Sequence, residues 1–174
     1  MGVVPERDFP ENRRIFVVQA IVVTTIHRSA LVPHSPEQMF ALVDDIERYP
    51  EFLPWCRSAR EISRDEDEVV ASLDLAKGSV HKTFTTRNRL QPGKMIEMRL
   101  VDGPFRHLEG FWRFDRLQGD ACRISLDLEF EFSSKLVGLA IAPVFNPVAN
   151  SLVDAFVQRA NRLYGQADGS GAGA

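Results

Sequence analysis

The stretch KLVGLAIAPVFNPVANSLVDAFVQRANRLY, residues 135–164, decides the fold of this chain. Its apolar residues recur every three or four positions, a spacing that aligns them along one stripe of an α-helix. Ser133 and Ser134 precede the stripe as candidate N-caps, and Gly165 follows it, where a left-handed residue normally ends a helix. Pro143 and Pro147 each remove an amide donor, so we expect a kinked or separate first turn and an unbroken helix from about Pro147. The stripe consists of Val137, Ile141, Val144, Val148, Leu152, Phe156, Ala160 and Leu163.

The residues that precede this helix predict its packing partner. From Cys122 to Phe132, apolar residues alternate with polar or charged ones. This period of two is typical of an antiparallel strand with one buried face and one solvated face. We expect the helix to lie on the buried face, where each large apolar side chain contributes roughly 1.5–3 kcal/mol before ordering costs are subtracted.

Alternation and turn residues predict further strands and two short helices upstream. Ser35 can cap a helix that begins at Pro36, and residues 44–56 are too rich in proline and aromatic residues for one regular helix. The predicted order is a strand, two short helices, six antiparallel strands and a long helix. This order indicates an α+β fold, a curved antiparallel sheet of about seven strands around the C-terminal helix. The upstream strands are expected at about residues 22–32, 58–64, 68–76, 79–90, 94–101 and 106–117.

Length and composition indicate one soluble domain. The 174 residues suffice for one hydrophobic core. We expect an N-terminal extension over residues 1–20, a domain over residues 21–165 and a disordered tail over residues 166–174, which are mostly Gly, Ala and Ser. Cys56 and Cys122 lack metal-ligand spacing, so we expect buried free thiols of a reducing compartment. The apolar run before residue 24 is too short to span a bilayer, and a cytoplasmic location follows.

The distribution of charge leaves two alternatives open. The net charge of −3 argues against general nucleic-acid binding and against DNA as a partner. Residues 37–68 contain ten acidic and four basic side chains, whereas residues 77–123 contain five acidic and ten basic ones. The two segments are either differently solvated faces, or the second is a basic patch for an anionic partner. In the latter case the candidates for rRNA contact are Arg87, Arg89 and Arg99.

The sequence contains no motif that predicts catalysis. A nucleophile elbow, a P-loop, a dinucleotide-binding glycine pattern and a zinc helix are all missing from it. The four histidines lie on different predicted elements without a partner four residues away, so no metal site is expected. We therefore expect neither a catalytic residue nor a bound cofactor.

The predicted inner face of the sheet carries more aromatic and methionine side chains than one helix must cover. They either fill a solid core or line an apolar cavity, which for a small-ligand site should reach at least about 300 Å³. Phe52, Leu53 and Trp55 are expected at its entrance, and Lys82 and Thr86 share the inward alternation of the strand. The expected lining is Leu73, Phe84, Met98, Leu100, Trp112, Phe114, Val148, Leu152 and Phe156.

Several segments resemble one known family, the coenzyme Q-binding, START-like family of the polyketide cyclase/lipid transport superfamily. The resemblance spans about residues 27–165 and is strongest toward its bacterial ribosome-association branch, RatA. It implies a helix-grip (START/Bet v 1-like) fold in which the sheet and the C-terminal helix enclose a hydrophobic cavity. The segments that carry it are SALVP at 29–33, YPEFLPWC at 49–56, FTTRN at 84–88, LVDGPF at 100–105 and FEFSS at 130–134.

The resemblance implies functions of different classes. One is a non-enzymatic carrier of ubiquinone or a related prenylated lipid, which supports respiration and makes transient contact with a membrane. Another is a toxin that binds the large ribosomal subunit and blocks subunit association. A third, an aromatase/cyclase, requires an acid–base pair in the cavity, and the sequence offers none.

Overall fold

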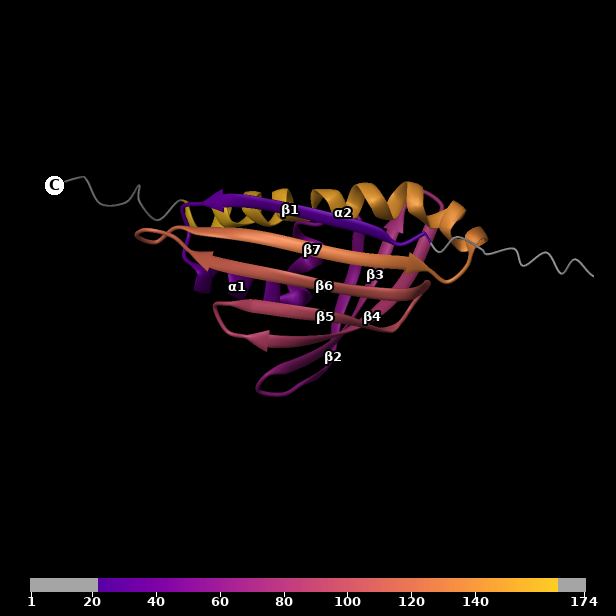
Figure 1. Cartoon of the computed structure of the whole chain (residues 1–174), viewed down its shortest axis with the longest axis horizontal. Coiled ribbons are helices and arrows are strands. Elements are labelled where there is room, and N and C mark those ends of the chain that lie inside the picture. Colours follow the sequence, from indigo (N-terminus) through magenta and orange to yellow (C-terminus); the bar gives the residue numbers. More distant parts are fainter. Residues whose placement is uncertain (1–21, 166–174) are drawn as a thin grey trace, which may run out of the picture.

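The structure, a computed structural model, describes residues 22–165. Seven strands of this range form one antiparallel sheet in the order β1-β7-β6-β5-β4-β3-β2, with a long helix along its β1–β7 side (Figure 1). This is the predicted α+β helix-grip architecture. The predicted extension (1–20) and tail (166–174) lie outside the described residues. The elements are β1 (Thr24–Val32), α1 (Pro36–Asp44), the 3₁₀-helix η1 (Ile46–Glu51), β2 (Cys56–Arg64), β3 (Glu68–Lys77), β4 (Val80–Gln91), β5 (Met95–Asp102), β6 (Phe105–Arg116), β7 (Cys122–Phe132) and α2 (Lys135–Tyr164).

α2 begins and ends at the predicted residues, but Gly165 is right-handed, with a φ of −74°, so the prediction of a left-handed end is wrong. Ser134 is the N-cap, and its side chain accepts a hydrogen bond from the backbone N–H of Val137. The helix is continuous through Pro143 and Pro147, so the prediction of a separate first turn is wrong. Both prolines are exposed, and water can therefore solvate the carbonyl groups that they leave without an amide donor.

The buried side of α2 differs from the predicted stripe. Ile141, Val148, Phe156 and Ala160 are buried as predicted, but Leu163 is 48% exposed. The last turns of α2 pack against α1 rather than the sheet, since the Tyr164 hydroxyl lies 3.4 Å from the Gln38 carbonyl oxygen. The prediction for Leu163 is therefore wrong. Half-buried positions of the stripe are Val137, Val144 and Leu152, and additional buried residues are Phe145, Ala149 and Val153.

α2 passes a simple test for a membrane-spanning helix because of its length and its mean hydropathy of 1.6 over the best window. The side chains of Ile141, Phe145 and Phe156 are nevertheless buried in the hydrophobic core of the domain. That window is 28% buried, and the row of α2 that faces the sheet belongs to the core of the domain.

The two short helices close one end of the inner face. A capping box starts α1, since Gln38 N–H donates to Ser35 Oγ and Ser35 N–H donates to Gln38 Oε1. The second helix, η1, is joined to α1 by the Tyr49 hydroxyl, which donates to the Val43 carbonyl oxygen at 2.5 Å. Burial raises the pKa of Tyr49, so the hydroxyl remains a donor.

Strand register determines which residues share the inner face below α2. Leu73 lies opposite Phe84, and Met98 lies between Asn88 on β4 and Gly110 on β6. A Cβ atom at position 110 would lie 2.6 Å from Met98 Cε and 3.1 Å from Leu128 Cδ1. The missing side chain of Gly110 therefore leaves the room that the long Met98 side chain occupies.

Candidate ligand cavity

A cavity of about 70 Å³ lies between the inner face of the sheet and α2, and it is partly open to the surface. Its walls are apolar apart from a few side-chain polar atoms, chiefly those of Thr86 and Asn88 on β4. The prediction of a cavity of at least about 300 Å³ is therefore wrong.

Two aromatic clusters fill the rest of the inner face. In the first, the Phe145 ring packs edge-on against Phe105 at 4.9 Å and against Phe130 at 4.8 Å, between ring centroids. In the second, the Phe156 ring packs edge-on against Trp112 at 5.2 Å and Tyr49 at 5.3 Å. Such rings bury large areas and interdigitate closely. The cavity is the space that remains between the Phe145 cluster and the Phe156 cluster.

Most of the predicted lining residues are brought together around this space, although contact with a ligand remains a prediction. Phe114 is an exception, because its ring packs at 5.7 Å against Phe40 of α1. Leu100 packs against the core without facing the cavity, and Lys82 is exposed. The predicted residues that line the cavity are Trp55, Leu73, Phe84, Met98, Trp112, Val148, Leu152 and Phe156.

The entrance differs from the prediction. Leu53 is only 1% exposed and is a core residue. Phe52 packs against Phe156 with ring centroids 5.2 Å apart, and the Arg159 guanidinium lies 5.2 Å from the centroid of the Phe52 ring. The lining residues that are only half-buried are Leu73, Met98 and Leu152. These three, rather than Phe52 and Leu53, mark where the cavity can open.

Several residues that line the cavity were not predicted from the sequence. Phe145 and Ala149 were missed because the buried side of α2 is rotated from the predicted stripe, and Ile46 and Tyr49 because η1 had no predicted orientation. Asn88 could have been predicted to face the cavity, since it continues the alternation of Phe84 and Thr86 along the same strand. The remaining lining residues are Ala71, Leu108 and Leu128.

Thr86 and Asn88 form a buried polar pair. They are 5% and 6% exposed, and Thr86 Oγ1 donates a hydrogen bond of 2.9 Å to Asn88 Oδ1. This bond directs the carbonyl oxygen of the amide toward Thr86. The amide nitrogen is left with its two N–H donors, and the residue lines the cavity.

The described lining of the cavity contains one titratable side chain. Among its described lining residues the titratable one is Tyr49, whose raised pKa keeps it protonated. Residues 22–165 also contain no cluster of His, Cys, Asp and Glu that could hold a metal ion. Cys56 and Cys122 are buried free thiols as predicted, and burial raises the pKa of each to about 11.

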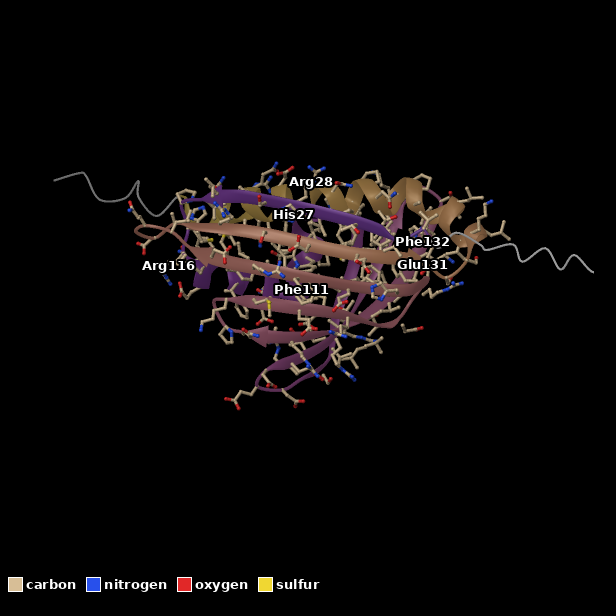
Figure 2. The ribbon with its side chains drawn as sticks, in the orientation of Figure 1. His27, Arg28, Phe111, Arg116, Glu131 and Phe132 are labelled. Atoms are coloured by element: carbon tan, nitrogen blue, oxygen red, sulfur yellow. The ribbon has the colours of Figure 1, made fainter. Side chains whose placement is uncertain are left out.

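The three candidate arginines for rRNA contact lie on the outer face of the sheet, each more than half exposed. Arg87 Nε is 3.2 Å and Arg89 Nε 3.9 Å from Glu68 carboxylate oxygens. Arg99 pairs with Glu97 at 2.7 Å and with Glu109 at 3.0 Å. Figure 2 shows this face crowded with charged side chains, with His27 and Phe111 among its labelled residues. The arginines are therefore exposed and already paired with carboxylates.

Comparison with known proteins gives the family. The family model described as polyketide cyclase/dehydrase and lipid transport matches residues 32–157. The chain belongs to this family. A ribosome association toxin RatA from Vibrio cholerae is 50% identical over 141 residues, 81% of this chain and 98% of the toxin. A RatA from Pseudomonas aeruginosa is 49% identical over 82% of this chain and 99% of its own length.

More distant similarities carry other names. The mitochondrial coenzyme Q-binding protein COQ10 homolog B of Xenopus laevis is 31% identical over 79% of this chain and 58% of its own. The solution structure of an 18 kDa protein, CC1736, from Caulobacter crescentus is 31% identical, with a TM-score of 0.64 over 82% of this chain and 99% of its own. The ZhuI aromatase/cyclase from Streptomyces sp. R1128 has a TM-score of 0.74 over 85% of this chain and 99% of its own at 16% identity, a likeness of fold alone.

Proposed function

We propose that the protein is a non-enzymatic, cytoplasmic binding protein for a hydrophobic ligand, with ubiquinone or a related prenylated quinone as the ligand in support of respiration. The observation that carries the proposal is the apolar cavity between sheet and α2 with one buried polar pair in its wall. Sites for small apolar ligands combine these two features. The coenzyme Q-binding name of a 31% identical relative supports the choice of ligand class.

The ligand must enlarge the cavity, because about 70 Å³ is too small for a quinone. Met98 is the side chain best suited to move, since an unbranched thioether changes rotamer readily and Met98 is only half-buried. Leu73 and Leu152 are half-buried and can move toward solvent. Each CH₂ group of the ligand tail that leaves water contributes about 0.8 kcal/mol, which offsets the displacement of these side chains.

Loading and delivery would occur at a membrane, because a prenylated quinone is far more soluble in a bilayer than in water. In this proposal the contact is transient and α2 remains packed on the sheet. The chain supplies a sheltered apolar site and does no chemistry on the ligand.

The test is a titration with decylubiquinone, followed by tryptophan fluorescence because Trp55 and Trp112 line the cavity. Leu152→Trp places a larger ring at the half-buried wall and should weaken binding by about 5- to 150-fold, which corresponds to an overpacking penalty of about 1–3 kcal/mol. Leu163→Trp, on an exposed position of the same helix, is the matched control and should bind as the wild type does. Equal affinities of both variants would refute binding in this cavity.

A second candidate function is association with the large ribosomal subunit. Relatives that are about 50% identical over 81% of this chain bear the name ribosome association toxin, and exposed arginines lie on the outer face of the sheet. In this candidate, rRNA phosphates would replace Glu68, Glu97 and Glu109 as partners of the arginines. Co-sedimentation with large subunits at low and high salt tests it, since phosphate contacts weaken steeply with salt.

A further inference from the structure

Asn88 is an unusual residue for the middle of a strand whose side chain faces an apolar core. It is 6% exposed, whereas its neighbour Arg87 points to the outer face and is exposed. A buried amide without hydrogen-bond partners costs free energy relative to an apolar side chain of the same shape. The buried side-chain amide of Asn88 therefore requires hydrogen-bond partners.

The surroundings of Asn88 provide a hydrogen-bond partner for the carbonyl oxygen of its side-chain amide but not for the nitrogen. Thr86 Oγ1 donates to the carbonyl oxygen, Oδ1, at 2.9 Å. The residues opposite Asn88 on the neighbouring strands are Val69 and Met98, which bring no strong acceptor to the Asn88 nitrogen. The hydroxyl of Tyr49, another polar atom in the wall, is used by the Val43 carbonyl oxygen. Within residues 22–165, no side-chain hydrogen bond engages the nitrogen of this amide.

We infer that Asn88 is a recognition residue whose amide N–H groups donate to an acceptor oxygen on the head group of the ligand. The inference rests on the proposed function and specifies its ligand: a ring that carries a carbonyl oxygen, rather than any hydrocarbon of suitable size. Thr86 is the positioning residue, because its hydroxyl holds the Asn88 carbonyl oxygen and so turns the donor end toward the cavity.

The same geometry selects a redox state. The Asn88 nitrogen is purely a donor, and a quinone carbonyl is purely an acceptor. A quinol hydroxyl also carries a proton that needs an acceptor, which the Asn88 nitrogen cannot provide, and the Thr86 and Asn88 oxygens already share a hydrogen bond with each other. Asn88 therefore favours the oxidised quinone over the quinol.

The experiment measures dissociation constants of the full chain for three probes: decylubiquinone, decylubiquinol and decylbenzene. The last has a similar tail and no oxygen. The wild type should bind the quinone more tightly than the other two. Asn88→Leu should weaken quinone binding about tenfold, as expected for loss of one buried hydrogen bond to the ligand, and should leave decylbenzene binding unchanged or tighter. Its melting temperature should stay close to that of the wild type, because the apolar area gained at position 88 offsets the loss of the Thr86 hydrogen bond.

Thr86→Val provides a second route to the same conclusion and retains Asn88. The amide is then free to rotate, so the preference for quinone over quinol should fall while decylbenzene binding persists. If the wild type binds none of the probes, the proposed function itself fails. If it binds the quinone and both variants keep the wild-type preferences, the cavity is a carrier site without recognition by Asn88, and the inference is overturned.

Discussion

The two faces of β4 carry opposite chemistry on alternate residues. Phe84, Thr86 and Asn88 are buried below α2, whereas Arg87 and Arg89 are exposed and paired with Glu68. The inner face is held by interdigitated rings, and the outer face by ion pairs in high dielectric that are worth at most about 1 kcal/mol each. Stability therefore depends mainly on the inner face, and the proposed ligand and the candidate ribosomal partner would use opposite faces of the sheet. Substitutions on one face can test one function while sparing the other.

The largest effect is expected at the centre of the Phe145 cluster. Phe145→Ala should lower the free energy of unfolding by about 3–5 kcal/mol, because a buried ring is removed and its neighbours collapse only in part. Leu139→Ala, on the same helix and 68% exposed, is the control and should change stability by less than about 0.5 kcal/mol. Urea unfolding of the two variants gives both values. A similar small loss for both would show that the inner face is not the main source of stability.

Acid should weaken the outer face first. Hydrogen bonds from His27 and Arg113 hold the pKa of Asp127 below its ordinary value, and Ser58 and Thr83 do the same for Asp74. A lowered folded pKa means that the stabilisation is present above the unfolded pKa, about 3.9, and is lost as pH falls through the folded value. Stability should therefore fall below about pH 4. Asp127→Asn should be less stable than the wild type at pH 7, and its free energy of unfolding should fall less steeply below pH 4. Urea unfolding at several pH values measures both effects. An unchanged pH dependence would contradict this assignment.

The smallest effect on stability is expected for the paired arginines. Reversing Arg87 and Arg89 to Glu should lower the free energy of unfolding by at most about 1 kcal/mol per residue and leave decylubiquinone binding unchanged, because both side chains lie on the opposite face from the cavity. If the outer face binds the ribosome, the same variant should lose co-sedimentation with large subunits at low salt. Unchanged sedimentation, or none by the wild type, would remove the second candidate function.

The elements could be predicted from the sequence because their signals are local. Each predicted strand boundary agrees with the structure within two residues, since the alternation and the turns between strands are read over a few neighbours. The capped start of α2 at Ser134 was likewise predictable. The buried side of α2 was harder to predict. Residues three or four positions apart shift gradually around the helix, and contact with the curved sheet determines which row of them is buried.

The cavity volume depends on long-range packing and could not be predicted. The sequence shows that Phe84, Met98 and Trp112 share a face, but not that Phe145 would enter the space between Phe105 and Phe130. The carboxylate partners of the arginines were only partly predictable, since Glu68 reaches Arg87 and Arg89 through a pairing between distant strands. The inward position of Asn88 could have been predicted, because it continues the alternation of Phe84 and Thr86 by two residues.

Native mass spectrometry of the freshly purified full chain, followed by lipid extraction, tests the central claim most directly. The account predicts a population whose mass exceeds that of the protein by one prenylated quinone, and this population should be absent for Leu152→Trp and present for Leu163→Trp. Protein that carries no lipid, and that also fails to bind added decylubiquinone saturably, would contradict the account.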